Sequence, residues 1–216
     1  MHMPIRFSLL KYWNPTFVET GTSHGAGVKK ALNARFKKIY SIELKEEFHK
    51  DCVRKFEKPI RQGKVELLLG DSAFCLEDLL ERIDTRTTFW LDAHYSGGKS
   101  GKGVEDVPLM RELDLIAEHH IKNHTILIDD VRCFGRDGVV DWSTVSLDLV
   151  VEALRKINPA YAISYEQGIT RNDVLVADIQ EFRWCKLFSK PEEAVTLLRS
   201  QIQRVLKRLR SGRPAQ

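Results

Sequence analysis

The chain has 216 residues, of which 30% are charged and 43% hydrophobic, and its formal net charge is +4. This length suits one domain with a substantial core, and the composition excludes a collagen-like or disordered chain. No run approaches the roughly 18 consecutive apolar residues of a membrane-spanning helix. The N-terminus lacks the pattern of a signal peptide and the four cysteines have no C-x-x-C spacing. We therefore expect a cytoplasmic protein with reduced thiols and neither a disulfide frame nor a zinc site.

Strand and helix signals alternate along most of the chain. This alternation predicts an α/β protein with a Rossmann-like, doubly wound, mostly parallel sheet. The closing strand-turn-strand pattern predicts that the last strand is antiparallel. Strands are expected at residues 17–18, 38–44, 65–69, 87–91, 125–128, 161–165 and 174–177, and helices at residues 28–36, 45–56, from about 73, 108–120 and 143–157.

A glycine-rich turn follows the first strand and precedes the first helix. Its sequence is acidic-x-G-x-x-x-G-x-G, formed by Glu19, Gly21, Gly25 and Gly27. Glycines allow a tight turn and a close approach of the backbone to a ligand. The helix N-terminus behind them offers free N–H groups and the positive end of a dipole. The pattern indicates a nucleotide-type cofactor site, although its spacing differs from the G-x-G-x-x-G of dinucleotide-binding proteins.

The next two strands also end in carboxylates. Glu43 lies at the end of the second strand, about 20 residues past the glycines, where a carboxylate can accept both ribose hydroxyls. Asp71 and Ser72 follow the third strand, and Asp71 is also a candidate N-cap for the helix that begins near Ala73.

The glycine-rich turn resembles motif I of the class I S-adenosylmethionine (SAM) methyltransferases. This resemblance implies that Glu19 faces the cationic methionine part of SAM and that Asp71 binds the adenine edge. It also implies that the backbone N–H of Ser72 contributes to adenine binding. The resemblance covers roughly residues 17–177, most of the chain.

Three further carboxylates follow the fourth and fifth strands, namely Asp92, Asp129 and Asp130. If these strands are neighbours, the three side chains meet at one edge of the sheet, where a cation would offset their repulsion. Carboxylate oxygens suit Mg²⁺, with Mn²⁺ and Ca²⁺ as alternatives. The arrangement is similar to that of metal-dependent O-methyltransferases, closest to the macrocin or antibiotic-sugar type. This similarity implies a metal that lowers the pKa of the acceptor hydroxyl.

His94 is the candidate general base, because the unperturbed pKa of histidine lies near operating pH. A hydrogen-bonded structural histidine is the alternative. In the catechol type the base is a lysine, and Tyr95 stands at that position here.

Two segments have simpler interpretations. The stretch 96–103 contains Gly-Lys-Ser but lacks the earlier glycine of a phosphate-binding P-loop, so we interpret it as a lid beside the site. Residues 186–216 carry eight basic and two acidic side chains and form a predicted basic helix at about 191–210. We expect this extension to dock on the domain formed by residues 1–185 or to form a homodimer, rather than to bind nucleic acid.

The sequence thus favours a SAM-dependent O-methyltransferase that acts on a small or sugar-like hydroxylated acceptor with Mg²⁺ assistance. Two alternatives stay open. One is a non-catalytic SAM- or nucleotide-binding protein of the same fold. The other is a different nucleotide-binding α/β enzyme, such as a nicotinamide oxidoreductase, against which the motif spacing argues.

Overall fold

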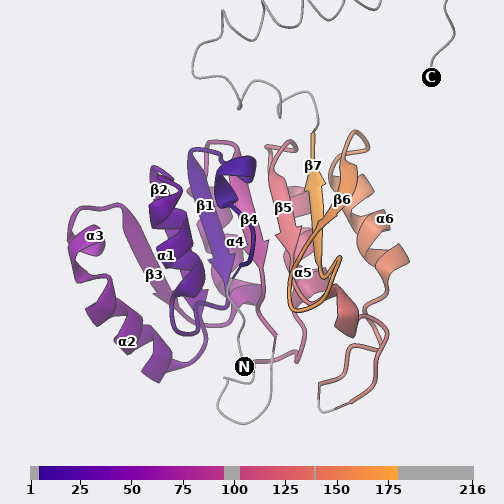
Figure 1. Cartoon of the computed structure of the whole chain (residues 1–216), viewed down its shortest axis with the longest axis horizontal. Coiled ribbons are helices and arrows are strands. Elements are labelled where there is room, and N and C mark those ends of the chain that lie inside the picture. The colour runs from indigo at the N-terminus through magenta and orange to yellow at the C-terminus, as the bar shows by residue number, and fades with distance from the viewer. Residues whose placement is uncertain (1–4, 95–102, 139, 180–216) are drawn as a thin grey trace, which may run out of the picture. The chain divides into compact units, whose positions relative to one another are not determined.

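The computed structural model describes residues 5–94, 103–138 and 140–179, which contain one seven-stranded sheet in the order β3-β2-β1-β4-β5-β7-β6 (Figure 1). β7 is antiparallel to both of its neighbours, and the pairs among β1 to β5 are parallel, which confirms the fold class expected from the sequence. The strands are β1 (Thr16–Thr20), β2 (Lys38–Glu43), β3 (Val65–Leu69), β4 (Thr87–Leu91), β5 (Thr125–Ile128), β6 (Ala162–Glu166) and β7 (Val174–Asp178).

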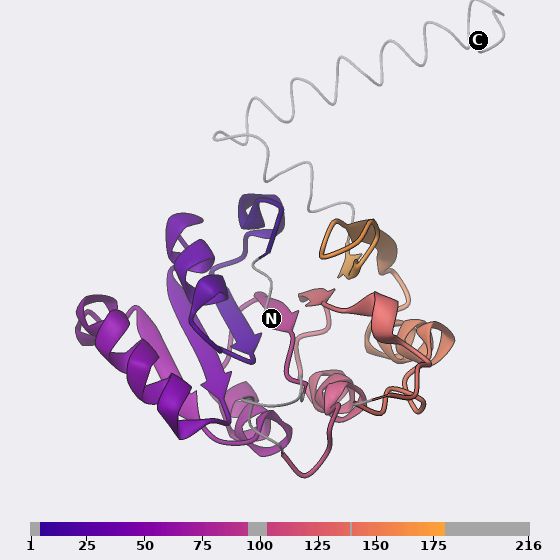
Figure 2. The same ribbon diagram turned by 60° about the horizontal axis from the view of Figure 1, so that its bottom comes forward.

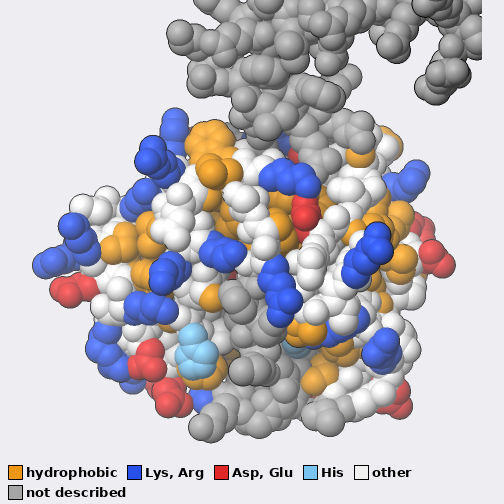
Figure 3. All heavy atoms as spheres, viewed as in Figure 1, with side chains coloured by type: hydrophobic (Ala, Val, Ile, Leu, Met, Phe, Trp, Pro, Cys, Tyr) orange, Lys and Arg blue, Asp and Glu red, His pale blue; other side chains and the backbone are white. Residues whose placement is uncertain are grey.

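Helices cover both faces of this sheet (Figure 2). One core packs β-strand side chains such as Val18 and Phe89 against α4, α5 and α6. The other packs Phe17 and Trp90 against α1, α2 and the segment before β1. Figure 3 shows the side that carries α1 and α2, where Lys and Arg side chains are scattered among uncharged atoms. The helices are η1 (Leu9–Tyr12), α1 (Ala26–Asn33), α2 (Glu46–Lys55), α3 (Glu57–Arg61), α4 (Ser72–Glu81), α5 (Leu109–Glu118), η2 (Val131–Cys133) and α6 (Leu147–Ile157).

Two helix boundaries, the end of α1 and the start of α6, differ from the predicted ones for local reasons. α1 begins at Ala26 and ends at Asn33, before Arg35, which has a φ of 61° that no helix can continue through. α6 begins four residues later than predicted because the Ser146 hydroxyl caps it, accepting the N–H of Leu149 at 3.2 Å. The short helices η1, α3 and η2 were not predicted.

The strand order reverses between β1 and β4, which lie side by side at the centre of the sheet. In open α/β sheets ligands bind beyond the carboxyl ends of the strands at such a reversal. β4 and β5 are parallel neighbours, as expected, so the turns after β1, β4 and β5 meet at one edge.

Two predicted features lie outside the described residues. They are most of the proposed lid at 96–103 and the basic extension at 186–216, with its expected boundary at residue 185. Within the described part of the chain, no helix has the length and apolar character needed to cross a membrane.

Candidate active site

The glycine-rich turn needs glycine at two positions. Gly21 and Gly25 have φ values of 87° and 74°, in the left-handed region that side chains disfavour. A Cβ atom on Gly21 would lie 2.6 Å from the carbonyl oxygen of Asp92, and one on Gly25 would lie 2.4 Å from the ring of Phe56. The turn therefore packs against β4 on one side and α2 on the other.

Glu19 lies beneath this turn with no solvent exposure. Its Oε2 accepts the Ser41 hydroxyl at 2.7 Å, and its Oε1 lies where a Cβ on Gly27 would come within 1.7 Å. Burial raises the pKa of Glu19 to about 8, and the Ser41 hydrogen bond opposes this shift. Glu19 thus supports the turn from inside the protein, and its contact with a cationic ligand stays a prediction.

Glu43, at the end of β2, is held by two backbone donors. Its Oε2 accepts the N–H of Ser23 at 2.6 Å, and its Oε1 accepts the N–H of Lys45 at 2.8 Å. Each carboxylate oxygen has a second lone pair, so the group is oriented while it keeps acceptor capacity for a ligand hydroxyl.

Asp71 caps α4, as expected, and accepts the N–H of Ala73 at 3.0 Å. Its other oxygen accepts the N–H of Val104 at 3.0 Å, which links the turn after β3 to the segment that precedes α5. Ser72 is buried as the first residue of α4.

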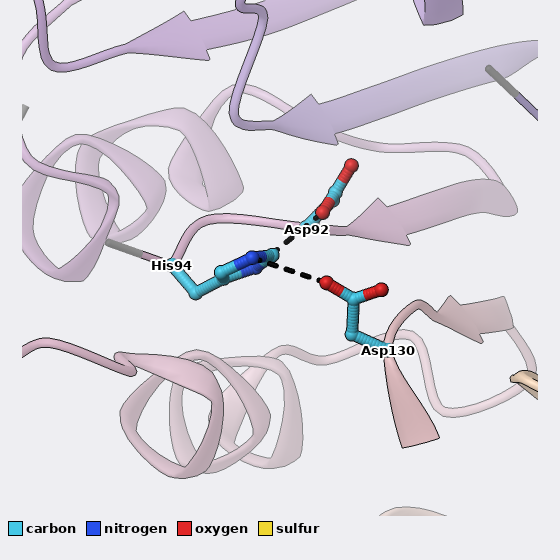
Figure 4. A group of neighbouring side chains, drawn as sticks. All are labelled: Asp92, His94 and Asp130. Carbon is cyan, nitrogen blue, oxygen red and sulfur yellow. Dashed lines mark ion pairs between the residues drawn. The ribbon is translucent and has the colours of Figure 1, made fainter. Parts of the chain in front are cut away.

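His94 lies between two carboxylates (Figure 4). Its Nδ1 is 3.5 Å from Asp92 Oδ1, and its Nε2 is 3.1 Å from Asp130 Oδ2. Asp92 follows β4 and Asp130 follows β5, so the sheet brings together these two residues and the candidate base. Burial lowers the pKa of His94, while Asp130 raises it.

Two carboxyl groups at this edge, those of Asp92 and Asp129, have pKa values shifted toward the neutral form. Burial, followed by repulsion from Asp129 and Asp130, raises the pKa of Asp92 well above its usual range. Burial and Asp130 raise the pKa of Asp129 to about 7, although its Oδ1 accepts the N–H of Asp130 at 2.9 Å. Asp130 itself is in the left-handed conformation, with a φ of 62°. Such shifts and strain are frequent at functional sites.

Arg132 and Asp173 extend the cluster and were not identified from the sequence. One Arg132 nitrogen pairs with Asp130 Oδ1 and lies 2.6 Å from Asp173 Oδ2. Asp173 precedes β7 and is remote from Asp130 in the chain, so only the antiparallel pairing of β7 with β5 brings them together.

A hollow beside the cluster is lined by Glu112, from α5, as well as by Asp92, His94, Asp129 and Trp142. Glu112 is buried, and burial raises its pKa to about 7, opposed by the hydroxyls of Ser72 and Thr20. The sequence contained a signal that we missed, because Glu112 falls on the otherwise apolar face of its helix. No Lys or Arg is among the residues described as lining this hollow.

The donor atoms partly match the expected metal site. One group consists of Asp92, His94 and Asp130, and another of Asp129, Asp130 and Asp173, each with ligand atoms within 4.8 Å of one another. The predicted trio therefore divides between two groups that share Asp130. Such spacing fits a divalent cation, and the imidazole nitrogen suits Mn²⁺ or a later transition metal better than Mg²⁺.

The similarity of this chain to known proteins is found in its structure and not in its sequence. No protein-family model matches the chain, and no curated protein matches its sequence. The Podospora anserina methyltransferase PaMTH1, bound to S-adenosylhomocysteine (SAH), matches with a TM-score of 0.54 and 15% identity over 80% of this chain and 75% of that one. The SAM-bound O-methyltransferase TomG of Streptomyces achromogenes, involved in tomaymycin synthesis, matches with a TM-score of 0.53 and 13% identity over 79% and 75%.

A third match is the O-methyltransferase from Bacillus cereus in complex with SAH, with a TM-score of 0.51 and 14% identity over 79% of this chain and 76% of that one. At these identities the likeness shows the fold. The described residues therefore have the Rossmann-like fold of SAM-dependent methyltransferases, with its mostly parallel seven-stranded sheet.

Proposed function

We propose that this protein is a SAM-dependent O-methyltransferase that acts on a small or sugar-like hydroxylated acceptor. The observation that carries the proposal is the pairing of His94 with Asp92 and Asp130 at the carboxyl edge of the sheet, next to the glycine-rich turn. Gly21 packs directly on the backbone of Asp92, so the turn adjoins the residue that carries one of the two carboxylates.

In this proposal SAM lies along the ends of β1, β2 and β3. The turn at Gly21, Gly25 and Gly27 faces its methionine part, and Glu43 accepts the ribose hydroxyls. Asp71 and the backbone N–H of Ser72 bind the adenine edge. Because Glu43 and Asp71 are already fixed by backbone donors, the site is preorganised, which reduces the entropy lost on binding.

The acceptor hydroxyl lies in the hollow beside His94 and attacks the methyl carbon in line with the sulfur. A carbon–oxygen bond forms, the carbon–sulfur bond breaks, and the bonding electrons stay on sulfur, which becomes the neutral thioether of SAH. His94 takes the hydroxyl proton as general base at Nδ1, whose 3.5 Å separation from Asp92 is longer than an ordinary hydrogen bond, while Nε2 stays paired with Asp130, which stabilises the imidazolium that forms.

We also propose that a divalent cation assists the reaction. Asp92 and Asp130 would hold it together with the imidazole of His94, and Asp129, the third carboxylate of the predicted trio, lies in the neighbouring group that shares Asp130. When bound, it would supply a Lewis acid that lowers the pKa of the acceptor hydroxyl. Without it, His94 alone serves as the base.

The rival proposals predict different binding and turnover. Calorimetry with SAM, SAH and NAD tests the cofactor, and SAM binding in the micromolar range without NAD binding supports a methyltransferase. Transfer of a labelled methyl group to a panel of sugars, diols and phenols tests the activity. His94→Gln should abolish transfer and leave SAM affinity unchanged. A protein that binds SAM and methylates none of the panel would support the non-catalytic alternative.

A further inference from the structure

The Arg132 guanidinium is shared between two carboxylates of different elements. A single nitrogen, Nη1, pairs with Asp130 Oδ1 and also lies 2.6 Å from Asp173 Oδ2. The other oxygen of Asp130 faces His94 at 3.1 Å. Arg132 therefore occupies one side of the Asp130 carboxylate while His94 occupies the other.

Asp173 is built to hold this arginine. Its side chain has no exposed surface, and its two oxygens accept four hydrogen bonds in all. Oδ1 accepts the backbone N–H of Arg132 at 3.1 Å. Oδ2 accepts Nη1–H of Arg132 at 2.6 Å and the backbone N–H groups of Ile169 at 2.8 Å and Thr170 at 3.2 Å. Its carbonyl oxygen also accepts the N–H of Val131 at 2.9 Å. The side chain of Asp173 is thus fixed by the turn before β7 and cannot follow Asp130 if Asp130 moves.

We propose that Arg132 is a built-in counter-cation of Asp130, which a divalent ion must displace, and that Asp173 is the positioning residue that retains the displaced guanidinium. The arginine has two carboxylates to pair with, so it can leave Asp130 without becoming an unpaired buried charge. Asp130 would then be free to share the ion with Asp92 and His94. This inference rests on the proposed function only for the use of the metal, because the exchange of cations needs neither SAM nor an acceptor.

The physical argument is competition between two positive charges for one carboxylate. A guanidinium and a divalent ion on the same group repel each other strongly at a partly buried site. Removing the arginine should therefore strengthen metal binding, whereas removing Asp173 leaves the whole charge of Arg132 to Asp130 and should weaken it. A merely structural role would weaken binding in both variants, so the signs of the two effects separate the explanations.

The test measures binding of Mn²⁺ alone to the full chain, from the electron paramagnetic resonance signal of the free ion, with neither SAM nor acceptor present. Arg132→Gln should raise the Mn²⁺ affinity by at least about tenfold, since it removes one competing charge. The Mn²⁺ affinity of Arg132→Lys should lie between those of Arg132→Gln and the wild type. Asp173→Asn should have a lower Mn²⁺ affinity than the wild type. Arg136→Gln removes the same charge from an exposed position of the same segment and should change little.

A second substitution locates the ion. Asp92→Asn in the Arg132→Gln background should remove the gain if the ion lies between Asp92, His94 and Asp130. If the gain survives, the ion has taken the arginine's own place between Asp130 and Asp173, and the displacement proposal is wrong. The proposal is also wrong if Arg132→Gln fails to raise the affinity while circular dichroism shows an intact fold. If Asp173→Asn does not fold, the Mn²⁺ affinities of Arg132→Gln, Arg132→Lys and Arg136→Gln still test the proposal. Because no methyl transfer is measured, failure of the proposed function would not affect these results.

Discussion

Ser23 and Glu43 are 20 positions apart and are joined by a hydrogen bond of 2.6 Å from the Ser23 N–H to Glu43 Oε2. Ser23 has a φ of 47°, so the bond fixes a residue in the left-handed conformation at the middle of the glycine-rich turn. The carboxylate that we assign to the ribose therefore also stabilises the turn that we assign to the methionine part of SAM. One side chain connects the two halves of the proposed cofactor site.

Replacement of this side chain should weaken cofactor binding. Glu43→Ala removes a charged acceptor of the ribose hydroxyls and frees the N–H of Ser23, and we expect SAM affinity to fall by about 1.5–3 kcal/mol, roughly ten- to a hundredfold. Calorimetry provides the measurement. Glu47→Ala is the matched control, because Glu47 is an exposed carboxylate on the neighbouring helix. Unchanged SAM affinity in Glu43→Ala would remove this residue from the site.

The contact between Glu19 and Gly27 predicts a pair of coupled substitutions. Gly27→Ala places a Cβ within 1.7 Å of Glu19 Oε1 and should lower the free energy of unfolding by about 1–3 kcal/mol through overpacking. In a Glu19→Ala background the same change should be much less harmful, because the clashing oxygen is gone. Urea unfolding of the four proteins gives the coupling. Gly138→Ala serves as control, since the atom nearest to its Cβ is 4.0 Å away. Additive effects would contradict the contact.

Glu112 predicts a pH dependence of stability. Burial raises its pKa from 4.5 to about 7, so the folded protein keeps a proton that the unfolded chain loses. This contribution to stability is complete below about pH 4.5 and is lost as pH rises to about 7, a change on the order of 3 kcal/mol. Glu112→Gln cannot ionise and should therefore be more stable than the wild type at pH 8, with a similar stability at pH 4.5.

Urea unfolding at both pH values measures this effect. Glu19 and Asp129 also have raised pKa values, but they contribute equally to both proteins and cancel in the difference. Asp114→Asn, at an exposed position of the same helix, should leave the pH dependence unchanged. If Glu112→Gln shows the same pH dependence of stability as the wild type, the pKa of Glu112 does not change on folding and the prediction is wrong.

The sequence predicted the strands better than the helix boundaries. Three strands, β3, β4 and β5, have the bounds that the sequence indicated, because short apolar and β-branched runs are bounded by polar turns. Helix ends depend on single residues, here the cap at Ser146 and the left-handed conformation of Arg35. The spacing of apolar residues along a helix does not indicate either feature.

The candidate site was predictable where it follows strand ends and unpredictable where it depends on tertiary pairing. Asp92 and Asp130 end adjacent parallel strands, so their proximity follows from topology. The place of His94 between them depends on how the chain turns after β4. Asp173 reaches Asp130 only through Arg132 and the pairing of β7 with β5, which no local pattern encodes.

The last prediction separates a metal-assisted mechanism from one with His94 alone. Asp129 accepts the N–H of Asp130 and lines the hollow, whereas the proposed contacts with SAM lie on β1 to β3. Asp129→Asn should therefore leave the fold and SAM affinity intact. If a cation assists, the substitution should lower turnover by roughly a hundredfold or more, because the acceptor hydroxyl loses part of its Lewis acid. EDTA should have a similar effect, reversed by added Mg²⁺ or Mn²⁺. Asp137→Asn, an exposed change in the same segment, should leave turnover unchanged. If EDTA has no effect while His94→Gln abolishes transfer, the reaction uses the imidazole as its base without a metal, with Arg132 as the cation paired with Asp130.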